Sequence, residues 1–169
     1  MNITPLSGKL AGPVTSDELG GKGFGLIRLL QQGYEVPPGF VVNAGVFEAL
    51  MHACGGDQIL AKLCGALLED DIDAALKHAA AVRQLIEALV LPEELMAEIE
   101  RAIAAVDCDI FAVRSSAACE DGATYSWAGQ FESILSVPRA EIMPSIKLCW
   151  KSAYSERAVH YAWKTGHSV

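Results

Sequence analysis

Arg114 and the two serines that follow it have side chains of the types that bind anions. They come after an apolar, strand-like run, IFAV, and open a stretch of small residues. A guanidinium group offers planar, bidentate donors, serine hydroxyls add further donors, and glycines let backbone N–H groups approach a ligand. This combination suits a bound phosphate. A structural alternative, in which Arg114 pairs with Glu120 or Asp121 in an ordinary loop between strands, is equally compatible with this segment alone.

A second candidate anion site lies near the N-terminus, where four glycines between positions 20 and 25 surround Lys22. They precede an apolar pattern that predicts a short helix from Leu26 to Gln32. Glycine-rich backbone before a helix start exposes unpaired N–H groups and the positive end of the helix dipole, and both attract anions. The segment is not a Walker A motif, because the GK[ST] ending and its spacing are missing. Glycines before a helix also often form only a turn.

Six sequence blocks occur in a specific order along the chain. They are GGKG with the helix after it, VPPGF, VRSS, the ED pair, WAGQFES and KLCWKSAYSERAVHYA. In this order they resemble the N-terminal nucleotide-binding domain that phosphoenolpyruvate synthase, pyruvate phosphate dikinase and rifampin phosphotransferase share. The resemblance extends from about Gly20 to Tyr161, and an ordered set of blocks is far more specific than any one of them. It implies the front part of an ATP-grasp-type module.

The resemblance also implies an ATP site. Lys22 and Arg114 correspond to the basic residues that hold the ATP phosphates and act in catalysis, and the region from Ser126 to Ser133 corresponds to the loop that covers them. The implied ATP-binding residues are Gly21, Lys22, Gly23, Arg114, Ser115, Ser126, Gly129, Gln130 and Ser133. Mg²⁺ would accompany ATP, with its acidic ligands expected in the second half of the module. We assign no metal ion to side chains of this sequence, and we favour an orienting role over metal binding for the pair Glu120 and Asp121.

At 169 residues the chain has the length of one ordinary domain. We expect residues 1–169 to be the N-terminal part of a longer ATP-binding domain, either a fragment or a truncated relative. The resemblance implies that ATP donates a phosphoryl group to a histidine on another domain, from which it passes to pyruvate or, in the rifampin branch, to an antibiotic hydroxyl. The expected partners are ATP and the remaining domains or a separate partner chain. The alternative is a standalone nucleotide-binding or interaction domain that does not catalyse the reaction.

Composition narrows the classes of protein further. The formal net charge is −8 and the pI is about 4.9, which disfavours a broad nucleic-acid surface and requires any phosphate site to be a local basic patch. No apolar run approaches the roughly 20 residues of a membrane span, and the N-terminus lacks the apolar core of a signal peptide. The five cysteines form an odd set without CxxC spacing, which is typical of thiols in a reducing compartment. We therefore expect a cytoplasmic protein.

The predicted fold class is α+β and helix-rich, with helices packed on a mixed sheet. We expect the strands near Phe40, Phe111 and Ile134 to share that sheet. Apolar residues recur at helical spacing from Ile72 to Val106, a stretch without recognisable chemistry that we interpret as scaffold. A further helix is expected from Glu141 to Lys164, with Pro144 tolerable only in its first turn.

Three expectations concern the site itself. The ATP interpretation requires the charged ends of Lys22 and Arg114 to face one cleft, within roughly 10 Å of each other. The segment from Ala117 to Gly129 is expected to be mobile or poorly packed without ligand, because it has small residues, two glycines and no long apolar run. The isolated chain should bind ATP weakly or not at all, since the adenine-contacting half of the module is missing.

Overall fold

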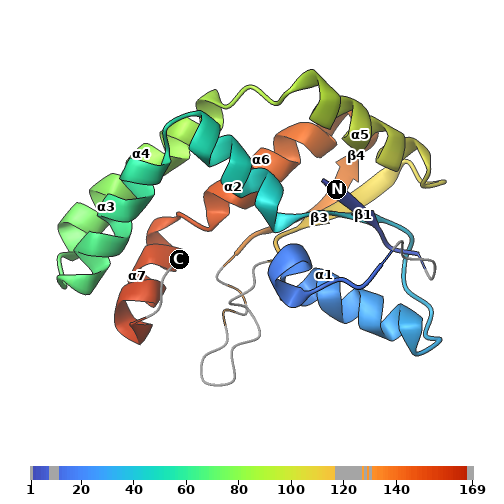
Figure 1. Cartoon of the computed structure of the whole chain (residues 1–169), viewed down its shortest axis with the longest axis horizontal. Coiled ribbons are helices and arrows are strands. Elements are labelled where there is room, and N and C mark those ends of the chain that lie inside the picture. The colour runs from blue at the N-terminus through green and yellow to red at the C-terminus, as the bar shows by residue number, and fades with distance from the viewer. Residues whose placement is uncertain (1, 8–11, 117–126, 128, 130, 167–169) are drawn as a thin grey trace. The chain divides into compact units, whose positions relative to one another are not determined.

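The computed structural model describes residues 2–7, 12–116, 127, 129 and 131–166. Its described part is rich in helix and contains two small antiparallel sheets (Figure 1). In chain order the elements are β1 (Ile3–Pro5), α1 (Ser16–Gln31), β2 (Phe40–Val42), α2 (Ala44–Ala53), α3 (Asp57–Leu68), α4 (Ile72–Ala88), α5 (Glu93–Ala104), β3 (Ile110–Arg114), β4 (Ser133–Pro138), the 3-10 turn η2 (Arg139–Glu141), α6 (Ile142–Ser152) and α7 (Glu156–Thr165).

The chain divides into two compact units. Unit one comprises residues 1–48, 91–109 and 116–126, and unit two comprises residues 49–90, 110–115 and 127–169. Each unit therefore combines segments that are far apart in the sequence. The helix-rich α+β class predicted from the sequence is confirmed in the described residues.

Unit one contains the sheet of β1 and β2, in which Ile3 lies opposite Val42 and Pro5 opposite Phe40. The buried Thr4 hydroxyl donates to Asn43 Oδ1 at 2.9 Å, which ties the end of β2 to β1. Helix α5 contacts β1 in the same unit. Its apolar residues recur at helical spacing, so that one stripe of the helix is buried. The buried residues of that stripe are Leu95, Ile99 and Ile103.

Helix α1 begins with a capping box. Thr15 Oγ1 accepts a hydrogen bond from the Glu18 amide at 3.3 Å, and Glu18 Oε2 accepts one from the Thr15 amide at 3.0 Å. These bonds satisfy N–H groups that have no partner inside a helix. The helix therefore starts at Ser16, well before the predicted start at Leu26. Its end is close to the prediction, because Gln32 is the C-cap and Gly33 adopts a φ of 85°.

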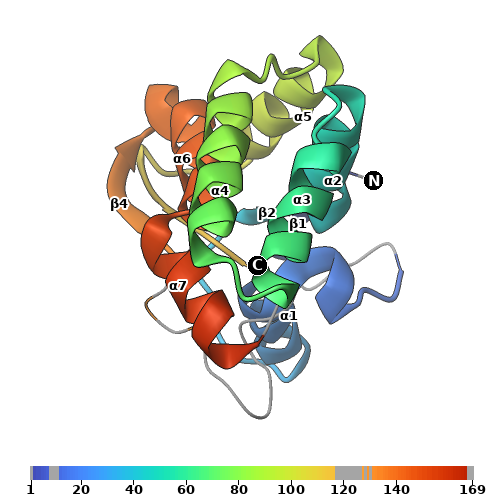
Figure 2. The same ribbon diagram turned by 90° about the vertical axis from the view of Figure 1, so that its left-hand side faces the viewer.

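Unit two is built around α4. Figure 2 shows α4 with α3 on one side and α6 and α7 on the other, and α4 contacts all three helices. Asp71 caps α4 by accepting from the Ala74 amide at 2.9 Å. At the other end, Lys147 from α6 donates to the backbone oxygens of Glu87 and Leu89, which stabilises the last turn. The fully buried stripe of α4 consists of Ala75, Ala79, Val82 and Ile86.

Strands β3 and β4 form the antiparallel sheet of unit two, and α6 packs against both. Buried Cys149 of α6 lies beneath this sheet, and its thiol donates to Val113 O at 3.6 Å. Two aromatic residues further along the chain join α4 and its neighbours. Tyr154 is buried, and its backbone carbonyl oxygen accepts a hydrogen bond from the Arg83 guanidinium group of α4. Trp163 of α7 donates from Nε1 to Asp70 Oδ1 at 2.5 Å, just before α4.

The strands near Phe111 and Ile134 share a sheet as predicted, but three predictions about elements are wrong. Strands 40–42 and 110–114 do not share a sheet, because β2 pairs with the short N-terminal strand β1 and β3 pairs with β4. Both sheets among the described residues are antiparallel rather than mixed. The expected helix from Glu141 to Lys164 is two helices, since Ser155 adopts extended backbone and its hydroxyl caps α7 by accepting from the Ala158 amide. Pro144 does lie in the first turn of α6.

Within the described ranges, no helix combines the length and apolar character needed to cross a membrane.

Candidate phosphate-binding site

Gly20 interrupts α1 and divides it into two helical pieces. Its backbone has φ 69° and ψ 168°, which is outside the helical region, whereas the residues on both sides are helical. L-residues with a side chain rarely adopt such a φ. The second piece therefore starts at Gly21, and Gly20 occupies the N-cap position before it. The glycine-rich segment is thus a kink inside a longer helix, with a new helix start placed at Gly21 and Lys22.

Ser116, which comes from a different segment of unit one, forms two hydrogen bonds at the kink. Its hydroxyl donates to Leu19 O at 2.7 Å and accepts from the Gly23 amide at 2.8 Å. Leu19 O belongs to the end of the first helical piece, and the Gly23 amide belongs to the first turn of the second piece. One hydroxyl therefore satisfies backbone groups on both sides of the kink.

Two glycines of this turn lie close to neighbouring atoms, and at Gly20 the approach leaves no space for a side chain. A Cβ on Gly20 would lie 1.8 Å from Ser116 O, and a Cβ on Gly23 would lie 3.1 Å from Val41 Cγ2. Gly20 is required by both its φ and this approach, while Gly23 packs tightly against the Val41 side chain of β2. Gly20, Gly21 and Gly23 are all buried.

Lys22 lies in the first turn of the second helical piece and is half-buried. This places a lysine beside amides that point out of a helix N-terminus, where the helix dipole also favours negative charge. The Gly23 amide donates within the protein, so its direct use by a phosphate would require the bond to Ser116 to break. Gly23 still contributes to the turn, because the absence of a side chain lets the helix start pack closely against Val41.

Arg114 and Ser133 lie opposite each other in unit two. Arg114 is the last residue of β3, Ser133 is the first of β4, and the two are cross-strand partners. Both are exposed, and Ser115 directly after β3 is half-buried. Directly opposite residues of an antiparallel pair are neighbours on one face. The structure therefore brings the predicted arginine and one predicted hydroxyl together at one end of this sheet.

Trp127 anchors the chain just before β4. Its ring is buried, stacks on Phe131 with centroids 5.2 Å apart, and meets Tyr161 edge-on at 4.9 Å. Gly129 between these contacts is exposed and has a φ of 76°. Aromatic pairs of this kind stabilise a structure by more than the burial of their apolar area alone. Trp127 and Phe131, two residues of the predicted loop from Ser126 to Ser133, are thus held in the core of unit two.

Several predicted features lie outside the described residues. They are Ser126, Gln130, Glu120, Asp121 and most of the segment Ala117–Gly129. Lys22 belongs to unit one and Arg114 to unit two. The expectation that their charged ends face one cleft stays a prediction.

Each unit holds groups of the types that bind phosphate oxygens. Unit one has Lys22 and glycine amides at a helix start, and unit two has Arg114 with the hydroxyl of its cross-strand partner Ser133. In the described part of the chain, no three His, Cys, Asp or Glu side chains are grouped so that they could hold a metal ion.

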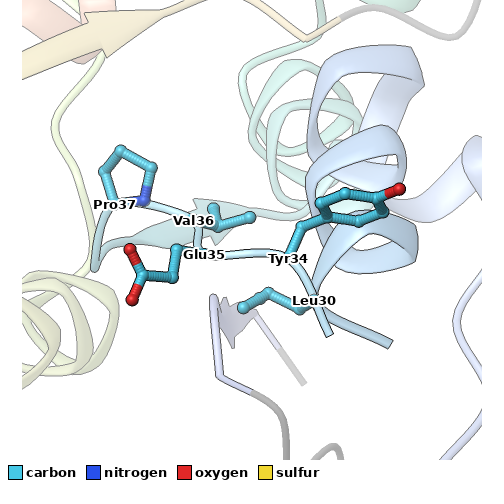
Figure 3. Close-up of a pocket in the computed structure, with 5 residues that line it drawn as sticks. All are labelled: Leu30, Tyr34, Glu35, Val36 and Pro37. Carbon is cyan, nitrogen blue, oxygen red and sulfur yellow. The ribbon is translucent and has the colours of Figure 1, made fainter. Parts of the chain in front are cut away.

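A surface pocket in unit one is lined by residues other than those of the candidate site. It is lined by the segment from Tyr34 to Pro37 together with Leu30 (Figure 3). None of the predicted ATP-binding residues lines it. We therefore do not include it in the candidate site.

Comparison with known proteins identifies the class. Residues 16–168 match the family described as pyruvate phosphate dikinase, AMP/ATP-binding domain, and the chain belongs to this family. It is 37% identical over 152 residues to a rifampicin phosphotransferase of Streptomyces sp, covering 88% of this chain and 18% of that protein. It is 32% identical over 149 residues to a probable phosphoenolpyruvate synthase of Methanothermobacter thermautotrophicus, covering 84% and 22%. Phosphoenolpyruvate synthase of Escherichia coli is 31% identical over 160 residues, covering 89% and 20%.

The chain thus spans about a fifth of the length of these relatives. The family confirms the resemblance drawn from the six sequence blocks and supports ATP as the ligand. Sequence reasoning noted Ser116 beside Arg114 but did not assign it to the site. Its signal was the hydroxyl in VRSS, whose partners are 93 and 97 residues away and could not be inferred from spacing.

Proposed function

We propose that this chain binds the phosphates of ATP in the first step of a phosphoryl transfer. The observation that carries the proposal is the helix start at Gly21, where Lys22 stands beside glycine amides at a kink that packing enforces. Membership of the AMP/ATP-binding family supports the same ligand. Lys22 and Arg114 would offset negative charge on the phosphates. Such electrostatic stabilisation, together with positioning of the reactants, is the main contribution of a protein to phosphoryl transfer.

The residues have separate roles in this proposal. Lys22 supplies a mobile point charge, whereas Arg114 supplies a planar fork that can hold two oxygens at once. Gly21, Ser115, Ser133 and the loop residues Ser126, Gly129 and Gln130 would supply amides and hydroxyls around the phosphates. Mg²⁺, when bound with ATP, would neutralise part of the phosphate charge.

The phosphoryl acceptor is proposed from the relatives. Both phosphoenolpyruvate synthases and rifampicin phosphotransferases are similar to this chain, so the similarity supports the ATP-using half of the reaction. We propose that the group passes to a histidine on another domain and from there to pyruvate or another acceptor. A nucleotide-binding domain without transfer activity is the alternative, and a transfer assay in the presence of the remaining domains separates the two.

ATP affinity tests the proposal directly. Of the two outcomes expected from the sequence, weak binding or none, the proposal requires weak binding of Mg·ATP by the chain. Lys22→Ala and Arg114→Ala should each lower that affinity about tenfold or more, because each removes a hydrogen bond to a charged group. Titration followed by NMR chemical shifts detects binding of this strength. Lys62→Ala is the matched control, since Lys62 is an exposed lysine of α3.

Two results would overturn the proposal. One is the absence of Mg·ATP-induced shifts at both Lys22 and Arg114. The other is an equal loss of affinity in the Lys62→Ala control, which would show that general charge and not these two positions attracts the nucleotide.

A further inference from the structure

The helical piece that starts at Gly21 has an N-cap position without a capping side chain. Helices usually begin with Ser, Thr, Asp or Asn, whose side-chain oxygen accepts from the amide two or three residues later. Gly20 stands in that position, has no such oxygen, and has no space for one, because its Cβ would lie 1.8 Å from Ser116 O.

Ser116 provides the missing oxygen from outside the helix. Its Oγ accepts from the amide of Gly23, which is the third residue of the new helical piece and the usual target of a capping side chain. The close approach that excludes a side chain at Gly20 is made by Ser116 itself. The same residue, Ser116, therefore excludes a capping side chain at position 20 and supplies the capping oxygen itself.

We infer that Ser116 is a positioning residue for the phosphate-binding turn. It caps the helical piece from Gly21 to Gln31 in place of Gly20 and so holds Lys22 and the first amides in the orientation that binds phosphate. This inference rests on the proposed function of the turn.

The hydrogen bonds of Ser116 indicate that it acts through the turn and not on the ligand. A serine hydroxyl has one proton to donate, and in Ser116 that proton goes to Leu19 O at 2.7 Å. It therefore has no proton to give to a phosphate. Its effect on binding must arise from keeping the kink and the helix start together.

Loss of the hydroxyl should lower the fraction of molecules in which the turn is formed. Apparent affinity falls in proportion to that fraction. We expect Ser116→Ala to weaken Mg·ATP binding about two- to thirtyfold, the range that corresponds to loss of an N-cap. Hydrogen exchange of the Gly23 amide should accelerate in the same variant without any nucleotide present. Ser116→Thr retains a hydroxyl and should restore both properties.

Thr4→Val is the matched structural control. Thr4 is a buried residue of unit one whose hydroxyl also donates a hydrogen bond, to Asn43, but it lies outside the turn. We expect this variant to lower the thermal midpoint while Mg·ATP affinity and Gly23 exchange stay at the parent values. If Ser116→Ala does not fold, Ser116→Cys keeps the size with a weaker hydrogen-bonding group and is measured in its place.

The outcomes separate this inference from the proposed function. If the parent chain binds Mg·ATP and Ser116→Ala binds it equally well, the positioning role is wrong while the proposed function stands. If Thr4→Val loses as much affinity as Ser116→Ala, Ser116 is merely structural and the inference is wrong. If the parent chain shows no Mg·ATP binding, the proposed function fails and the positioning role fails with it.

Discussion

Gly20 and Ser116 approach each other so closely that the backbone of one excludes a side chain on the other. The contact joins residues that the sequence separates widely, and both belong to unit one. Glycine is present at position 20 for a conformational reason and for a steric one. Gly25, in the same helix, has neither reason, because a Cβ there would meet nothing within 4 Å.

These two glycines give a matched pair of substitutions. We predict that Gly20→Ala lowers the free energy of unfolding by about 2 kcal/mol or more, since it combines an unfavourable φ with a clash. Gly25→Ala should raise it by about 0.5–1 kcal/mol, because alanine is the better helix former. Urea denaturation followed by circular dichroism measures both. Equal effects of the two substitutions would contradict the described kink.

At the scale of elements, much of the helical framework was predictable because its signals are local. Gly55 follows the end of α2, Asp71 caps the start of α4, and Pro92 precedes the start of α5. Strand β1 was not predicted, since three residues give no alternation that could be distinguished from loop. Strand β2 pairs with β1, and β3 pairs with β4 in a separate sheet.

For the candidate site, the sequence supplied residue types and a family resemblance. Together they selected Lys22 and Arg114, although each segment alone also fits a structural role, and the part of these two residues in ATP binding stays a prediction. The kink at Gly20 and the cap by Ser116 could not be predicted, because each depends on a contact across more than 90 residues. Local propensity does not contain such contacts.

Tyr154, just after α6, supplies a pH prediction at this scale. Burial raises the pKa of Tyr154 to about 12 from its ordinary value of 10. Because the folded-state pKa is the higher one, the neutral phenol favours the folded state. Its contribution is fully present below about pH 10 and is lost as the pH rises towards about 12.

We therefore expect the urea midpoint of the parent chain to fall between about pH 9 and about pH 11 by more than that of Tyr154→Phe, which has no proton to lose. The difference between the two proteins isolates Tyr154 from other groups that titrate in alkali. Parallel pH dependence of both proteins would show that the Tyr154 phenol is not buried as described.

At the scale of the whole molecule, the charge balance restricts where ATP can bind. The chain carries a formal net charge of −8, so its average field repels a nucleotide. Attraction must come from a local arrangement of cations and amides. The chain spans about a fifth of its relatives, and the ATP-binding role proposed here is the part of their chemistry that this segment would perform.

Paramagnetic NMR with Mn·ATP tests the central claim most directly, since the ion travels with the phosphates and broadens the signals of nearby amides. We predict selective broadening at Gly21, Lys22 and Gly23 of unit one and at Arg114 and Ser133 of unit two. Signals of helix α3 serve as the internal reference and should keep their width. Broadening that leaves these five residues unaffected, or that is uniform over the chain, would contradict the assignment of the phosphate site.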